Sequence, residues 1–212
     1  MFSPMIITRN GDVIPRITDM DDILDYVYPV MLPLGSTPPE VVKGYESGLD
    51  GVEFIFYIPS DVGYIPVTKA ICDHYGITAK ELVIRAHASV HDMVMQDVCK
   101  MFGNAVPEEL TMWAFSNTKR HHGSGLILSY DARLYISNTM KSDDIYIFPS
   151  SVHELILLRS EAVEHMGASA AELQDIVHQV NHDAVGAKEF LSNHVYRMHS
   201  VGQNILELET VI

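Results

Sequence analysis

Hydrophobic and polar positions in the first 76 residues predict one hairpin, a buried strand and several short helices. Residues 5–17 alternate around Asn10-Gly11, a dipeptide typical of a tight hairpin turn. A helix that begins in an acidic segment is predicted to end before Pro29. The other predicted elements are a short helix at 39–45, a buried strand at 52–58 and a helix at 66–76 that ends at Gly76.

The next segment allows two predictions. Thr78 and Glu81 form a capping box, so a helix is expected to begin at residue 79. Apolar residues keep a spacing of three or four as far as Val98, which is the helical period. The helix could therefore end near Ser89 or continue to Met101.

The second half predicts strands that alternate with helices. Strands are expected at 110–116, 125–130, 145–148 and 154–158, helices at 131–140 and 169–180, and a closing hairpin at 194–198 and 205–208. This pattern predicts an α+β fold, with a mostly antiparallel sheet built of hairpins and interspersed helices packed on it. We expect a single domain over residues 1–212, with a less regular part at 1–60 and a motif-bearing part at 110–212.

Composition and charge narrow the classes of partner. The chain has 212 residues, 47% hydrophobic residues and a formal net charge of −14. That hydrophobic content is typical of a globular domain, and the excess of acids argues against nucleic acid or an anionic membrane as the main partner. The one basic cluster, Lys119-Arg120-His121-His122, is interpreted as a solvated turn.

The cysteines and the N-terminal residues favour a cytoplasmic protein. Cys72 and Cys99 form no CxxC motif, and isolated thiols are typical of a reducing compartment. The first residues do not resemble a signal peptide, and no apolar run is long enough to span a membrane.

The common catalytic and cofactor motifs are missing from the sequence. It contains no phosphate-binding loop, no dinucleotide fingerprint and no nucleophile elbow, so no cofactor is implied. Two histidine pairs, His87/His91 and His178/His182, have the i,i+4 spacing that places imidazoles on one helix face, as a metal site would need. No third ligand is evident, so metal binding by either pair is a weak alternative.

The segment around Pro149 is the most distinctive. His153-Glu154 resembles the start of a zinc-protease motif, but position 157 is Leu, so that motif fails. Ser150 and Ser151 could form a corner between strands, or Ser151 could cap a helix with Glu154. A corner or cap does not require the imidazole of His153, so that residue is a candidate catalytic group.

Four features of residues 110–182 are distinctive together: Ser116-Asn117, Gly123, the run from Asp144 to Leu157 that contains Pro-Ser-Ser-x-His-Glu, and Val180-Asn181. With them, this region resembles a domain family of unknown function found in gut Clostridia, often near mobile-element genes. The resemblance implies a cytoplasmic bacterial protein without a known activity. It singles out Asn117, Ser150, Ser151, His153, Glu154 and Asn181, and among these the two asparagines are candidate ligand-binding residues.

Two functional hypotheses follow. The first is a non-catalytic binding or regulatory module, with another protein as its partner and the exposed turn 118–122 as a contact feature. The second is an enzyme in which His153 is a general acid or base and Ser150 or Ser151 a nucleophile or ligand donor. The sequence does not determine the substrate, the partner or the oligomeric state.

Overall fold

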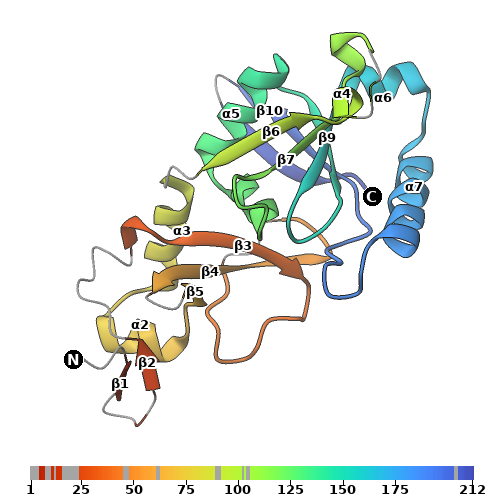
Figure 1. The fold of residues 1–212 in the computed structure, drawn as a ribbon. Helices are drawn as coiled ribbons and strands as arrows, with labels where there is room; N and C mark the ends of the chain where they lie inside the picture. The colour runs from red at the N-terminus through yellow and green to blue at the C-terminus, as the bar shows by residue number, and fades with distance from the viewer. Residues whose placement is uncertain are drawn as a thin grey trace.

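Antiparallel sheets form the framework of the computed structural model, which describes residues 5–7, 11, 13–15, 24–44, 48–60, 63–88, 92–101, 103, 106–202 and 205–212 (Figure 1). One sheet has six strands in the order β11-β10-β8-β9-β7-β6, a second has the order β3-β4-β5, and β1 pairs with β2. Every strand pairing in these residues is antiparallel. With helices interspersed between the strands, the predicted α+β class is confirmed.

The elements have the following bounds. The strands are β1 (Met5–Ile7), β2 (Val13–Pro15), β3 (Tyr28–Pro33), β4 (Val52–Ser60), β5 (Gly63–Pro66), β6 (Met93–Asp97), β7 (Trp113–Asn117), β8 (Ile145–Pro149), β9 (Leu155–Arg159), β10 (Tyr196–Ser200) and β11 (Leu206–Thr210). The helices are α2 (Lys69–Tyr75), α3 (Ala79–Ala88), α4 (Val98–Met101), α5 (Tyr130–Met140), α6 (Ser160–Met166) and α7 (Ala170–Ala184), with 3-10 helices η1 (Glu108–Leu110) and η2 (Gly123–Leu128).

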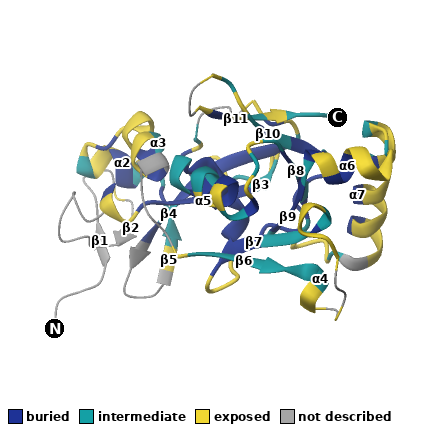
Figure 2. Cartoon of the chain, turned by 90° about the horizontal axis from the view of Figure 1, so that it is seen from above, coloured by how far each residue is buried: buried dark blue, intermediate teal, exposed yellow. Residues whose placement is uncertain are grey.

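The six-stranded sheet is covered on both faces because its central strands carry apolar residues at successive positions. On β8, Ile145 and Ile147 belong to the cluster that also contains residues of α5, whereas Tyr146 and Phe148 pack with residues of α6 and α7. Alternate side chains of a strand point to opposite faces, so the two helical layers lie on opposite sides of this sheet. Figure 2 shows buried strands between helices whose outer surfaces are exposed.

The three-stranded sheet joins the larger one through η2. A Cβ at Gly125 of η2 would lie 2.7 Å from both the Val30 Cα and the Met31 nitrogen and would also collide with the Pro29 carbonyl oxygen. Only glycine allows the backbones of η2 and β3 to approach this closely. The apolar cluster at this junction contains residues from both sheets, and α2 and α3 contribute to a second cluster with Phe56 and Ile58 of β4.

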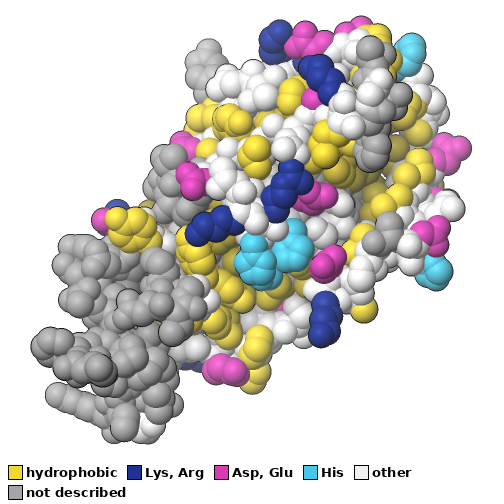
Figure 3. Space-filling model, viewed as in Figure 1, with side chains coloured by type: hydrophobic (Ala, Val, Ile, Leu, Met, Phe, Trp, Pro, Cys, Tyr) yellow, Lys and Arg dark blue, Asp and Glu magenta, His cyan; other side chains and the backbone are white. Residues whose placement is uncertain are grey.

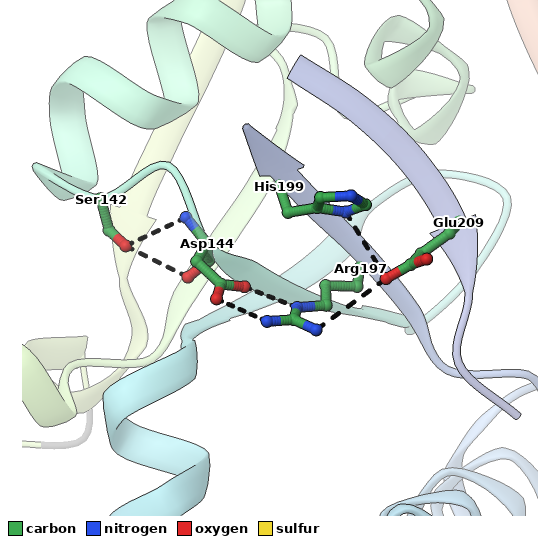
Figure 4. A network of polar contacts seen from close by, with 5 residues as sticks. All are labelled: Ser142, Asp144, Arg197, His199 and Glu209. Carbon is green, nitrogen blue, oxygen red and sulfur yellow. Dashed lines mark hydrogen bonds and ion pairs between the residues drawn. The ribbon is translucent and has the colours of Figure 1, made fainter. Parts of the chain in front are cut away.

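A polar network ties β10 to the start of β8 (Figure 4). Both nitrogens of the Arg197 fork bond to the Asp144 carboxylate at 2.6 Å, which lowers the pKa of Asp144. Glu209 on β11 lies 3.9 Å from Arg197 and 3.5 Å from His199. The network is partly exposed, so we interpret it as a bridge between strands that contributes modestly to stability.

Several element predictions are confirmed. The hairpin predicted at 5–17 corresponds to β1 and β2, and helix α2 ends at Gly76 with a left-handed C-cap. The capping box predicted at Ser169 and Glu172 begins α7. The closing hairpin corresponds to β10 and β11.

Of the two ends that the sequence allowed for the helix beginning at residue 79, the nearer one is confirmed, because α3 ends at Ala88. The longer helix is not formed, since the apolar residues that could have extended it form β6, paired with β7. One strand prediction is wrong, because tertiary pairing outweighs local pattern. The segment predicted as a strand at 125–130 forms η2 instead, since both edges of β7 are already occupied by β6 and β9.

The predicted helix at 39–45 is also wrong over its described residues. The Val42 N–H donates to the Val67 carbonyl oxygen, and the Gly44 N–H donates to the Phe54 carbonyl oxygen. Strand β3 and helix α6 were not predicted. No helix in the described ranges is long and apolar enough to cross a bilayer.

Candidate functional site

The turn that follows β7 is held in one conformation by the side chain of Asn117. Its Oδ1 accepts the His121 N–H (3.1 Å), and its Nδ2 donates to the His121 carbonyl oxygen (2.7 Å). The same Nδ2 donates to the hydroxyl oxygen of Tyr28 on β3 (2.5 Å). Arg120 and His122 have φ values of 50° and 53°, a left-handed region that non-glycine residues rarely adopt. Asn117 therefore fixes a strained turn against the three-stranded sheet.

His153 connects this turn to the turn between β8 and β9. Its Nδ1 accepts the His122 N–H (3.1 Å), and its carbonyl oxygen accepts the Gly123 N–H (3.1 Å) and the Ser116 hydroxyl (2.7 Å). A Cβ at Gly123 would lie 2.6 Å from the Asn117 nitrogen and 2.8 Å from the His153 carbonyl oxygen, so glycine is required there. Because Nδ1 is an acceptor, the proton of the neutral His153 ring is on Nε2.

A pocket of about 270 Å³ opens beside this connection, between the turn after β7 and the three-stranded sheet. Its lining is rich in tyrosine and also carries amide, imidazole and charged groups: Tyr26, Tyr28, Val30, Tyr57, Tyr64, Asp92, Asn117, Thr118, Lys119, His121 and His122. In Figure 3 histidine side chains gather at the middle of one face, bordered by hydrophobic and by Lys or Arg side chains. The pocket is thus apolar and aromatic with a few polar groups, as ligand sites usually are.

Three imidazole rings pack against each other at the edge of the pocket. The His121 ring lies 4.3 Å from the His122 ring and is stacked on the His153 ring at 5.2 Å, while His122 lies 5.7 Å from the Tyr57 ring. Burial and then the neighbouring histidines lower the pKa of His122 to about 4, so its ring is neutral at pH 7. None of the described residues offers a hydrogen-bond partner to the buried Nδ1 of His122.

Burial changes the pKa of one tyrosine that lines the pocket, and a lysine ammonium contacts the ring of another. Burial raises the pKa of Tyr28 to about 12, although the Asn117 amide opposes this shift, so the hydroxyl stays protonated. The Tyr28 and Tyr64 rings are tilted at 55° with centroids 5.8 Å apart. The ammonium of Lys119 stands 5.2 Å above the Tyr64 ring, within the range of a cation–π contact.

Of the six residues that the resemblance singled out, only Asn117 lines the pocket. Ser151 Oγ accepts the His153 N–H at 3.0 Å, and the Ser151 N–H donates to the Glu154 carbonyl oxygen at 3.2 Å. Ser151 is buried, and Ser150, His153 and Glu154 are half-buried. Ser151 and His153 therefore help to hold the turn that carries lining residues, without lining the pocket themselves. Their catalytic role stays a prediction.

Asn181 lies elsewhere, on α7. Its Nδ2 donates to the Ser192 carbonyl oxygen (2.8 Å) and to Asn193 Oδ1 (3.0 Å), which fastens the helix to the segment before β10. Each of the two asparagines organises its own turn, and Asn181 is not among the residues that line the pocket beside Asn117. The role of Asn181 in ligand binding stays a prediction.

Of the two histidine pairs that were candidate metal ligands, His178/His182 lies within the described residues and gains no third ligand there. His178 and His182 are exposed on α7, and His182 Nδ1 lies 2.9 Å from the Asp183 carboxylate. His91 and the side chain of His87 lie outside the described residues. Within the part of the chain that the structure describes, no group of three or more His, Cys, Asp or Glu side chains could hold a metal ion.

Sequence reasoning missed most of the pocket. Tyr28 and Tyr57 face each other as partners in the β3–β4 register, and Tyr64 follows on β5. In the sequence these tyrosines are typical strand residues, and only the pairing of three strands brings them together. His122, interpreted as part of a solvated turn, is half-buried, whereas Lys119, Arg120 and His121 are exposed as expected.

Comparison with known proteins identifies a family whose function is unknown. The model of a family described as "Family of unknown function (DUF5688)" matches residues 55–200, which cover β4 to β10. Searches of the curated proteins and of the solved structures found no match. The matched region contains both turns joined by His153, and the predicted resemblance to a domain family of unknown function is confirmed. The chain belongs to the DUF5688 family.

Proposed function

We propose that this chain is a non-catalytic binding module whose ligand enters the pocket between the three-stranded sheet and the turn after β7. The observation that carries the proposal is the convergence of tyrosines from β3, β4 and β5 on a turn that Asn117 and His153 hold rigid. A rigid aromatic pocket binds at low entropic cost, because its side chains are ordered before the ligand arrives. The ligand is a small molecule or a side chain presented by a protein partner.

Binding is favoured over catalysis by the positions of the candidate nucleophiles. Among the described residues that line the pocket, neither Ser150 nor Ser151 is present. The Ser151 hydroxyl accepts a backbone N–H, and the accepting nitrogen of His153 is occupied by His122. A serine activated by a histidine needs a hydrogen bond between the two side chains, and neither serine has one to His153.

The family resemblance adds a cellular setting to this proposal. A cytoplasmic module encoded near mobile elements would work with a soluble ligand or with a protein of the host or of the element. The acidic surface of the chain, with a formal net charge of −14, supports a partner that is not a polyanion.

A fragment screen by ligand-observed NMR tests the proposal. Small aromatic compounds, amines and carboxylates are screened against the wild type, against Tyr64→Ser and against Tyr135→Ser. Tyr64 and Tyr135 are both partly exposed, but only Tyr64 lines the pocket. We expect hits that Tyr64→Ser loses and Tyr135→Ser keeps. Hits that all three proteins share, or no hits, would contradict the proposed site.

A further inference from the structure

The walls of the pocket are built to attract positive charge. The Tyr28 and Tyr64 rings are tilted against each other, and the Tyr57 ring lies against that of His122. The face of an aromatic ring carries partial negative charge and attracts cations. Because both Tyr28 and Tyr57 keep their hydroxyl protons, the walls attract through their rings and carry no phenolate.

Charged and polar groups around the rings favour a cation over an anion. Asp92 contributes a carboxylate to the lining, and the whole chain carries a formal charge of −14, which raises the local concentration of cations. The Asn117 amide cannot serve an anion, since both its hydrogens are donated to Tyr28 and His121. His122 adds no positive charge that could attract an anion, because its lowered pKa keeps the ring neutral at pH 7. Its buried Nδ1 has no hydrogen-bond partner among the described residues.

The protein already places one cation in this pocket. Lys119 lies in the turn after β7, and its ammonium lies 5.2 Å from the Tyr64 ring centroid. This contact shows that an ammonium group on an aliphatic chain can reach the face of a lining ring. Lys119 is exposed, so its side chain can leave the ring without disturbing the core.

We infer that the pocket binds an alkylammonium group and that Lys119 competes with it for the Tyr64 ring. The inference rests on the proposed function and gives it a ligand class. The chemistry has two possible sources, a small free alkylammonium compound such as choline or the alkylated lysine side chain of a protein partner. Both present the same cationic head to the rings.

The test compares choline with its neutral carbon isostere, 3,3-dimethyl-1-butanol, by isothermal titration calorimetry. We expect choline to bind at least about fivefold more tightly, the effect of one cation–π contact of roughly 1 kcal/mol. Lys119→Ala should strengthen choline binding, because the competing ammonium is removed. Sodium benzoate should gain nothing from that substitution.

Two further variants locate the binding. Tyr64→Leu keeps the apolar volume but removes the aromatic ring face, so it should weaken choline roughly fivefold and leave the isostere unchanged. Tyr135→Leu, outside the pocket, should change neither. Circular dichroism checks that each variant is folded, and the partial exposure of Tyr64, Lys119 and Tyr135 makes this outcome expected.

The outcomes separate this inference from the proposed function. If the isostere or benzoate binds as well as choline and Tyr64→Leu abolishes that binding, the pocket is a ligand site but not a cation site, and the inference is overturned. If Lys119→Ala weakens choline binding, the proposed competition is wrong. If choline binds neither the wild type nor Lys119→Ala, the cation site is wrong, and the fragment screen decides the proposed function independently.

A short peptide with a trimethyllysine, compared with the same peptide carrying norleucine, identifies the source of the ammonium. Tighter binding of the trimethyllysine peptide than of choline would indicate a protein partner. Binding of choline alone would indicate a small free alkylammonium compound. Either result supports the alkylammonium chemistry, whereas measurable binding of both peptides with equal affinity contradicts it.

Discussion

Two Ser-x-His turns in this chain have the same local geometry and opposite surroundings. In Ser151-Val152-His153 and in Ser192-Asn193-His194, the serine Oγ accepts the backbone N–H of the histidine two residues later at 3.0 Å. In the first turn, the imidazole reaches outward to the His122 N–H beside the pocket. In the second, the imidazole turns back to within 3.0 Å of the Ser192 hydroxyl.

The second turn is closed by its neighbours. The Tyr196 hydroxyl lies 2.8 Å from Ser192 Oγ and donates to the Asp50 carbonyl oxygen at 2.7 Å. Gly51 packs so closely that a Cβ there would lie 2.5 Å from His194 Nδ1. A serine and a histidine in contact therefore do not make a site by themselves; what surrounds the turn decides whether a ligand can approach.

The largest expected effect is a loss of stability when the closely packed glycine beside each turn is replaced by alanine. Gly123→Ala and Gly51→Ala should each lower the free energy of unfolding by about 3 kcal/mol, because the new Cβ has no space. Gly186→Ala should have almost no effect, since nothing lies within 4 Å of its Cβ position. Urea unfolding of the three variants measures this. Equal stabilities would mean that the two turns are loosely packed.

The two asparagines sharpen the comparison next. Asn117→Ala and Asn181→Ala should each cost about 2 kcal/mol, because each removes side-chain hydrogen bonds to the backbone, those of Asn117 with His121 and that of Asn181 with the Ser192 carbonyl oxygen. Only Asn117→Ala should also weaken binding of a pocket ligand, since Asn181 lies away from the pocket. Calorimetric titration at a temperature where both variants are folded distinguishes them. Equal losses of affinity would contradict separate roles.

Removing the serine hydroxyl should destabilise the closed turn at Ser192 more than the turn at Ser151. Ser192→Ala removes an oxygen that has contacts to His194 and Tyr196, so we expect a loss of about 2 kcal/mol, whereas Ser151→Ala should lose about 1 kcal/mol. Thermal unfolding compares them. A larger effect at Ser151 would contradict this comparison of the two turns.

The smallest expected effect is the pH dependence of the free energy of unfolding that comes from His122, a residue of the pocket lining. The pKa of His122 is about 4 in the folded chain and 6.5 when unperturbed. Between those values the unfolded chain binds a proton that the folded chain does not, so stability falls as the pH falls. From about pH 7 to about pH 5 this contributes about 1 kcal/mol, after allowing for solvent screening of a half-buried ring.

His122→Asn is the matched variant for this prediction. Asparagine tolerates the left-handed conformation of position 122 and does not titrate. The variant should lose about 1 kcal/mol less than the wild type over the same pH range. If the two pH profiles coincide, burial of His122 is not coupled to its protonation.

The sequence predicted the fold class and many elements, because hairpin turns and helix caps leave local signals. Asn10-Gly11, Gly76 and the Ser169–Glu172 capping box are signals of this kind. The segment of η2 was predicted wrongly as a strand, and the sequence left open whether the helix from residue 79 would continue through the residues of β6. Both outcomes depend on the edges of β7, which β6 and β9 occupy.

For the site, the sequence predicted positions but not the arrangement. Asn117 and His153 were identified by the family motif, and they hold the turn that shapes the pocket. The reason for the imidazole of His153 is a backbone N–H 31 residues away along the chain, which no local pattern shows. Three of the lining tyrosines, Tyr28, Tyr57 and Tyr64, come from three different strands, so only the sheet register could bring them together.

The most direct test of the central claim is a ¹H–¹⁵N correlation spectrum of the wild type, titrated separately with choline chloride and with sodium benzoate. The pocket account predicts that the backbone amides of Thr118, His122 and Tyr64 shift with at least one of these probes. The amides of Asn181 and His194 should stay in place. Shifts centred on His194 or on α7, or no shifts near the β7 turn with either probe, would contradict a ligand site between the two sheets.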